Sequence, residues 1–219
     1  MNLGHFDLDE YRRFRAILRR HHNAIVKTVP DKTFRQCART LELLHGNKLE
    51  LSSESDLTIL YDYCIYSHHL RGRNLVQRFV NQLPLTEDNE EIAVRQAICR
   101  ARYSIFQIER LSKHRVIQAC DLVRGDKLSV VDESLSRTLK KGTFLGGRLI
   151  PLPDYWVTTG ACFPLDPEIV DFIQLVLIPA LKLTEGTTQT LSAEAEEELA
   201  ITVIGAAIQS GATALIKYQ

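Results

Sequence analysis

The sequence predicts an α+β protein in which a small five-stranded antiparallel β-barrel lies between two helical regions. Apolar residues recur at helical spacing in residues 1–101, and short β-type runs separated by glycine- and proline-containing turns fill residues 102–164. Helix-starting signals return in residues 165–219. A chain of 219 residues, of which 45% are hydrophobic, can bury a normal core without disulfides or metals. These ranges are therefore expected to form a helical region, a barrel, and a pair of C-terminal helices that pack on the rest.

The first hundred residues predict five helices. Asp7 and Glu10 have the spacing of a capping box, and apolar residues follow them three or four positions apart. Gly46 is a typical helix stop, and Ser53 is a typical helix start. The acidic run that begins at Glu87 suits the positive end of a helix dipole. The helices are expected at about residues 7–26, 30–46, 53–70, 75–84 and 87–101.

From Tyr103 onward the pattern changes to that of β-strands, with apolar residues on both alternating sets of positions. Two turn signals, Arg124-Gly125-Asp126 and Pro153-Asp154, each separate a pair of such runs and indicate β-hairpins. Five is the number of strands at which small barrels of the oligonucleotide-binding or Src-homology-3-like kind close. The strands are expected at about residues 103–108, 116–123, 127–131, 143–152 and 155–161.

The C-terminal region predicts two helices. Asp166 is expected to cap a helix that begins at Pro167, because proline is favoured at the first helical position, and Ser192 is expected to start the last helix. Residues 199–216 contain no charged side chain, and eighteen residues are about the shortest helix that spans a bilayer. Polar residues and two glycines interrupt this run, which favours a helix buried in the protein or at an interface between copies. We therefore expect no membrane partner, and self-association through this helix is one expected protein contact.

Charge and cysteine content limit the partners and the compartment. Lys and Arg number 19 against 14 Asp and Glu up to Arg115, and 8 against 13 after it, although the formal net charge is zero. This mild bias permits nucleic acid as a partner without requiring it. The five cysteines are odd in number and far apart, as in proteins of a reducing compartment. Because the N-terminus has no apolar segment of secretory length, the sequence predicts a cytoplasmic protein.

The sequence contains no motif of a known catalytic or cofactor site. The Gly-x-Ser-x-Gly, Gly-x-Gly-x-x-Gly and phosphate-loop patterns are absent, and no Cys-x-x-Cys pair exists. The histidine pairs are adjacent, whereas two histidines that share a metal on one helix are four positions apart. We therefore expect no catalytic residue, no cofactor and no bound metal.

Three groups of side chains are candidates for binding phosphate or a partner. They are an arginine row with a histidine on the first helix, a cationic cluster at the end of the third helix, and an aromatic and basic set on the barrel. Each has a structural alternative: a solvated helix face, a stabilised helix C-terminus, or a filled barrel with a cross-strand surface partner. The candidates are, in this order, Arg12, Arg15, Arg19 and His22; His68, His69, Arg71 and Arg73; and Arg148, Tyr155 and Trp156.

Part of the chain, residues 60–161, resembles a family of uncharacterised bacterial proteins in which a helical segment precedes a small β-barrel. Some members of that family end in a cysteine-rich zinc motif of the SEC-C type, which nothing after Cys162 can supply here. The matching residues are structural, so the resemblance implies a fold and no activity. They are Leu60-Tyr61-Asp62-Tyr63-Cys64, the run from Arg102 to Ile108, Leu139 to Thr143, Arg148 to Leu152, and Tyr155 to Gly160.

The function expected from these features is that of a non-enzymatic cytoplasmic binding or regulatory module that contacts a protein. The alternative is an RNA- or DNA-associated module that uses the basic first helix and the barrel surface. An enzyme whose type no motif identifies is a third hypothesis, because function resides in sites rather than in folds.

Overall fold

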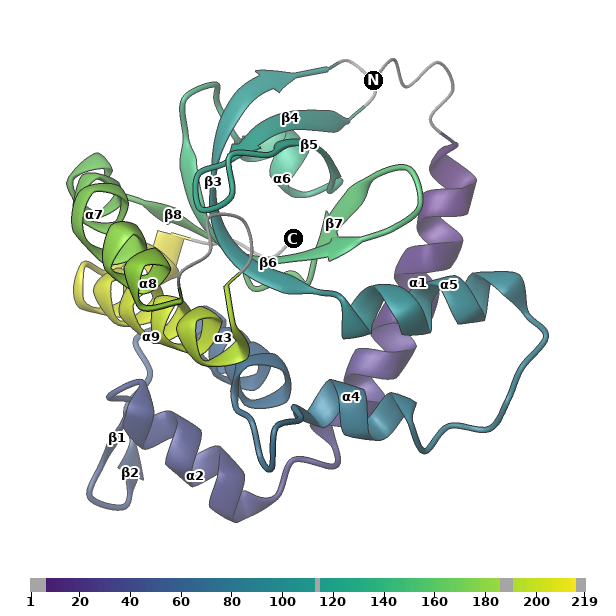
Figure 1. Cartoon of the computed structure of the whole chain (residues 1–219), viewed down its shortest axis with the longest axis horizontal. Coiled ribbons are helices and arrows are strands. Elements are labelled where there is room, and N and C mark those ends of the chain that lie inside the picture. Colours follow the sequence, from purple (N-terminus) through teal and green to yellow (C-terminus); the bar gives the residue numbers. More distant parts are fainter. Residues whose placement is uncertain (1–6, 113–114, 186–190, 216–219) are drawn as a thin grey trace.

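Helices surround a closed β-barrel in the computed structural model of this protein, which describes residues 7–112, 115–185 and 191–215 (Figure 1). The α+β class predicted from the sequence is confirmed. The helices are α1 (Leu8–Val26), α2 (Asp31–Thr40), α3 (Glu54–Asp62), the π-helix η1 (Tyr63–Ser67), α4 (Leu75–Val80), α5 (Asn89–Cys99), α6 (Leu135–Thr138), α7 (Pro167–Phe172), the π-helix η2 (Ile173–Leu177), α8 (Ile178–Glu185), α9 (Ala193–Gln209) and the 3-10 helix η3 (Ala212–Leu215). The strands are β1 (Leu44–His45), β2 (Lys48–Leu49), β3 (Arg102–Leu111), β4 (Val116–Asp121), β5 (Lys127–Val131), β6 (Phe144–Pro151), β7 (Trp156–Thr158) and β8 (Phe163–Leu165).

Five strands close the barrel in the order β3-β4-β5-β7-β6, and β6 returns to pair with β3. In the closing pair, Tyr103 lies opposite Arg148. Counted within the barrel, the order is 1-2-3-5-4-1, and helix α6 lies between the third and fourth strands. This connectivity is that of the oligonucleotide-binding fold and not that of the Src-homology-3 type.

The barrel is not purely antiparallel, so that part of the sequence prediction is wrong. Strands β5 and β7 run parallel, with Val130 opposite Trp156 and Val131 opposite Val157. Parallel neighbours need a long crossover connection, which α6 and β6 supply here. Turn signals identify antiparallel neighbours in sequence, but they do not identify the distant strands that close a barrel.

Two of the differences from the predicted elements add strands to the fold. The second helix ends at Thr40, and Gly46, with φ +63°, lies instead in the turn of the β1–β2 hairpin. Glycine with positive φ serves both helix stops and hairpin turns, so the residue alone did not distinguish them. The strand expected at residues 155–161 is shortened to β7, and β8 follows as an additional strand paired with β6.

Side-chain caps determine where several helices begin. Asp7 caps α1 as predicted, although its side chain bonds to a backbone N–H within the first turn rather than forming a full capping box. Ser53 and Asp56 form a reciprocal capping box at α3, and Asn74 and Gln77 form another at α4. These local bonds fix the directions in which α3 and α4 leave their loops.

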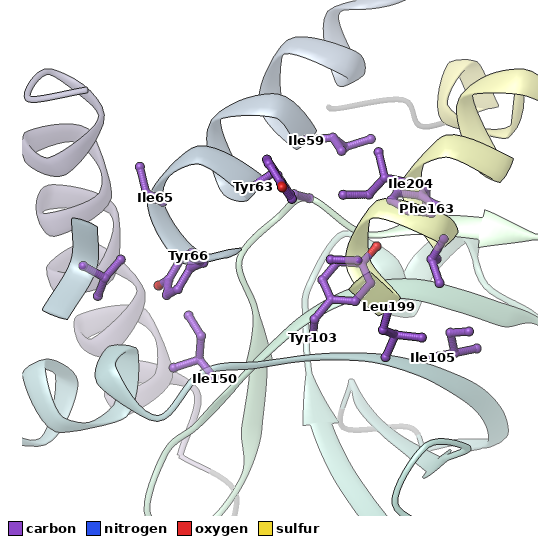
Figure 2. Packing of buried hydrophobic residues seen from close by; sticks show 14 of the residues in the cluster. Ile59, Tyr63, Ile65, Tyr66, Tyr103, Ile105, Ile150, Phe163, Leu199 and Ile204 are labelled. Atoms are coloured by element: carbon purple, nitrogen blue, oxygen red, sulfur yellow. The ribbon is translucent and has the colours of Figure 1, made fainter. Parts of the chain in front are cut away.

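The main hydrophobic core joins the N-terminal helices, the outside of the barrel and α9. Figure 2 shows Ile59 and Tyr63 of the α3–η1 segment beside Ile204 of α9, with Leu199 nearer to the strands. A second cluster, which includes Phe106, fills the barrel interior. In the described part of the chain, no helix has the length and hydropathy needed to cross a bilayer, and residue 216 of the uncharged run lies outside that part.

Candidate functional site

A cavity of about 320 Å³ lies between α1, α3, η1 and residues 159–161, and we call it the α1–η1 cavity. Its volume falls at the lower end of the range of small-ligand pockets, about 300–1,000 Å³. It is lined by both apolar and polar side chains. The polar ones are Arg15, Arg19, His22, Asn23, Thr58, Tyr61, Asp62, Tyr66 and Thr159.

Helix α1 brings three of the predicted candidates to this cavity. Arg15, Arg19 and His22 are separated by four and three positions, so they share one face of the helix. Buried residues on the neighbouring face, including Leu18, hold α1 against the core. The same spacing that made these residues a candidate group in the sequence therefore places them on one wall of the cavity.

A π-helical turn forms the opposite wall. The backbone N–H of His68 donates to the carbonyl oxygen of Tyr63 at 3.1 Å, five positions earlier. Turns of this kind are rare and occur frequently at functional sites. The Tyr66 side chain lies between η1 and α1 (Figure 2), and a hydrogen bond of 2.7 Å joins its hydroxyl to Nε2 of His22.

His22 and Tyr66 are both neutral at physiological pH. Burial, followed by the charge of Arg15, lowers the pKa of His22 to about 4. Burial, followed by the charge of Asp62, raises the pKa of Tyr66 well above its usual value of 10. A general acid or base works best with a pKa near the operating pH. Neither group is therefore poised to exchange protons at neutral pH.

The α1 wall carries two guanidinium charges. Arg15 Nη1 donates to the backbone carbonyl of Thr158 at 2.5 Å, which is a neutral acceptor. Arg19 is exposed and forms no hydrogen bond or ion pair with any residue that the structure describes. Among the described residues, Asp62 supplies the only carboxylate that lines the cavity. The mouth of the cavity therefore favours an anion.

Asp62 connects the cavity to the interior of the protein. Its Oδ2 accepts a hydrogen bond of 3.0 Å from Nε of Arg148, a side chain that is only 1% exposed. Its Oδ1 is buried and has no hydrogen-bond partner among the described residues. A buried acceptor left without a donor costs roughly 1–3 kcal/mol. A ligand that brings a donor to this oxygen would remove that cost.

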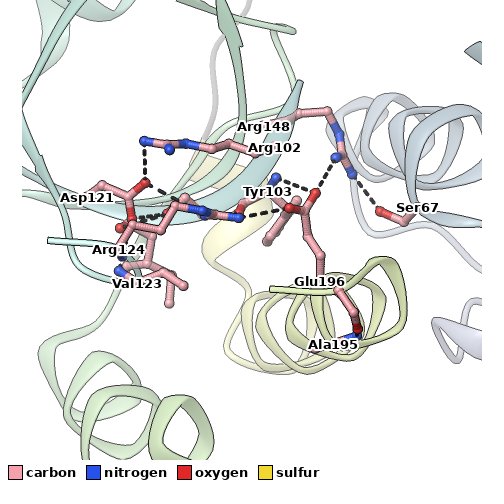
Figure 3. Close-up of polar contacts among 12 residues, drawn as sticks. Ser67, Arg102, Tyr103, Asp121, Val123, Arg124, Arg148, Ala195 and Glu196 are labelled. Carbon is pink, nitrogen blue, oxygen red and sulfur yellow. Dashed lines mark hydrogen bonds and ion pairs between the residues drawn. The ribbon is translucent and has the colours of Figure 1, made fainter. Parts of the chain in front are cut away.

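Figure 3 shows the ion-pair chain that continues from Arg148. Arg148 Nη1 lies 3.2 Å from Glu196 of α9, and the other oxygen of Glu196 lies 2.9 Å from Nη2 of Arg124. Asp121 lies 3.0 Å from Nη2 of Arg102, at the end of the barrel. This chain ties the wall of the cavity to α9 and to the β3–β4 end of the barrel.

The three candidate arginines of the first helix lie in different surroundings. Arg12 does not line the cavity, because its guanidinium lies 3.4 Å from Asp9 and 3.9 Å from Glu133. Arg15 is half-buried and Arg19 is exposed. Of the three arginines, Arg19 alone has its guanidinium free of the described residues.

The second candidate group lies at the end of η1, beside α9. His68 and His69 each have Nδ1 3.9 Å from a carboxylate oxygen of Glu197. Arg71 and Arg73 are exposed in the turn that follows, and Arg71 has φ +55°. Among the residues that the structure describes, no three His, Cys, Asp or Glu side chains are grouped so that they could hold a metal ion.

The third candidate group is mostly internal. Arg148 is buried, so it is not a cross-strand partner on the barrel surface. Its guanidinium lies 4.7 Å from the ring centroid of Tyr66. Tyr155 is buried, with its ring 6.3 Å from that of Tyr11. Trp156 is half-buried below the guanidinium of Arg102, at 4.4 Å. These barrel residues therefore present little surface for stacking nucleobases.

Sequence reasoning missed Asp62 and Tyr66 as site residues. Asp62 was a visible signal, because it is a single acidic residue within the otherwise uncharged run of residues 57–67. An acid on a buried helix needs a partner, and the partner is Arg148. No local sequence pattern predicted the π-turn that positions Tyr66.

A family of unknown function, DUF7986, matches residues 6–191. The chain belongs to this family. The DUF7986 match extends beyond the resemblance seen at residues 60–161 and includes α1, so it covers every element that lines the cavity. No curated protein and no solved structure matches the chain.

Proposed function

We propose that this protein is a non-enzymatic, cytoplasmic binding module that takes an acidic group of a partner protein into the α1–η1 cavity. The observation that carries the proposal is the pair of guanidinium groups, Arg15 and Arg19, that line the cavity without a carboxylate partner among the residues that the structure describes. A carboxylate that reaches them forms charge-assisted hydrogen bonds, which are stronger than neutral ones.

The residue types at the cavity support a protein as the partner. Tyr61, Tyr66, Arg15 and Arg19 all line it, and tyrosine and arginine are enriched among the residues that dominate protein–protein binding energy. Tyr61 packs against Phe34, with ring centroids 5.2 Å apart and ring planes tilted by 43°. A rigid aromatic beside a free guanidinium is a typical anchor for one inserted side chain or chain end.

The titration behaviour of the cavity supports binding rather than catalysis. His22 has a pKa of about 4 and Tyr66 has one far above neutrality, so neither supplies general acid or base chemistry at physiological pH.

The five cysteines are unpaired, as is usual in the reducing cytoplasm.

Replacing Arg19 with glutamine is expected to weaken binding of acidic peptides about ten-fold or more, because one charge-assisted hydrogen bond contributes roughly 1.5–3 kcal/mol. The measurement is fluorescence anisotropy with a labelled pool of random hexapeptides rich in Asp and Glu. Arg35→Gln, which removes an exposed charge on α2 outside the cavity, is the matched control and should leave binding unchanged. If the pool does not bind, or binds the Arg19 variant equally well, the cavity is not the binding site.

A second proposal is a nucleic-acid-associated module, which the oligonucleotide-binding connectivity of the barrel favours. Replacing Arg12, Arg15 and Arg19 together with glutamine should then reduce the salt dependence of binding to a labelled dT20 strand. Of these three arginines, only Arg19 has no hydrogen-bond or ion-pair partner in the described part of the chain, so the slope should change by about one unit rather than three. Absence of binding at low salt, where phosphate contacts are strongest, would exclude this function.

A further inference from the structure

We infer that the acidic group recognised by the α1–η1 cavity is a terminal carboxylate with an N–H donor next to it, as in the C-terminal residue of a partner protein. This inference rests on the proposed function and specifies the group that the cavity takes.

Two opposite walls of the cavity favour different groups of a ligand. Arg15 and Arg19 on α1 are cations that favour an anion. Asp62, at the end of α3, is 7% exposed, and its buried Oδ1 has no donor among the described residues. Its other oxygen already accepts a hydrogen bond from Arg148, so a donor that a ligand brings to Oδ1 would supply the contact that this oxygen lacks. A ligand that satisfies both walls carries an anion and a hydrogen-bond donor close to each other.

In a C-terminal residue, the carboxylate carbon and the backbone nitrogen are both bonded to the α-carbon. The anion and the N–H donor therefore lie close together. The cavity is also bounded by α1, α3, η1 and residues 159–161, and its volume is about 320 Å³. Such a space suits a chain end, which enters and stops, better than an internal Asp or Glu, whose chain must continue on both sides. Capture of a terminal carboxylate is a known mode of peptide recognition.

Free amino acids share this chemistry, so the experiment must separate the two sources. The full-length protein is titrated into labelled random hexapeptides that end in a free carboxylate. A matched pool ends in an amide and keeps internal Asp and Glu. A third pool has a methylated nitrogen at its last residue, which removes the N–H donor without changing the protein. A mixture of free amino acids is the competitor.

The acid pool is expected to bind at least about ten-fold more tightly than the amide pool and more tightly than the N-methylated pool. Arg19→Gln should abolish the preference for the acid over the amide, and Arg35→Gln, at an exposed position of α2 outside the cavity, should preserve it. Equal binding of the acid and amide pools would overturn the terminal assignment while leaving an acidic side chain as the partner group. Binding of free amino acids without binding of peptides would assign the site to a small molecule instead. If no pool binds, both the inference and the proposed function fail.

Discussion

Replacing Arg148 with alanine is expected to lower the free energy of unfolding by about 3–5 kcal/mol, the usual cost of breaking a buried ion pair from one side. Arg148 bonds to Asp62 at 3.0 Å, to Glu196 at 3.2 Å and to Ser67 Oγ at 2.5 Å. Glu196 would keep Arg124, but Asp62 would become a buried carboxylate without an ion-pair partner among the described residues. Because small domains have only about 5–15 kcal/mol of stability, this loss is a large fraction of the whole.

Urea denaturation of both proteins measures the effect. The variant Arg148→Met provides a sharper comparison, because adding Asp62→Asn to it removes the orphaned charge and should restore part of the stability. Arg71→Gln, at an exposed position, should change stability by less than about 0.5 kcal/mol. A loss of under 1 kcal/mol for Arg148→Ala would mean that this ion-pair chain does not stabilise the fold.

Replacing Gly147 with alanine is the second change with a large expected effect, about 3 kcal/mol or more of destabilisation. A Cβ at this position would lie 2.4 Å from Sγ of Cys162 and 3.0 Å from its Cα. The backbone of Gly147 also has φ +156°, which residues with a side chain rarely adopt. Strand β6 and the segment before β8 approach so closely at this point that only glycine fits.

The same substitution at Gly205 is the matched control. This glycine lies inside α9, and a Cβ there would meet no atom of the described residues within 4 Å. Since alanine costs less conformational entropy in a helix, Gly205→Ala should stabilise the protein by roughly 0.5–1 kcal/mol. Thermal denaturation should therefore give midpoint shifts of opposite sign for the two variants. A lowered midpoint for both would point to a general intolerance of change and not to the contact with Cys162.

The sequence contained most of the information about individual elements. Helical spacing predicted α1 and the face that carries Arg15, Arg19 and His22, and Asp7 marked its start. Glycine-containing turns and alternating runs predicted the barrel strands between residues 102 and 158. These signals are local, because a cap or a helix face is defined by residues within about four positions of one another.

What the sequence by itself determined is therefore the class of the fold, the type and order of most elements, and one wall of the candidate site. Only the tertiary structure decided that β5 and β7 pair in parallel, that a π-turn carries Tyr66 to His22, and that Arg148 is internal. The two carboxylate partners of Arg148, Asp62 and Glu196, are 86 and 48 positions away in the chain. An arginine in a strand looks the same in sequence whether it faces water or a buried carboxylate, because its environment is set by which distant surfaces pack together.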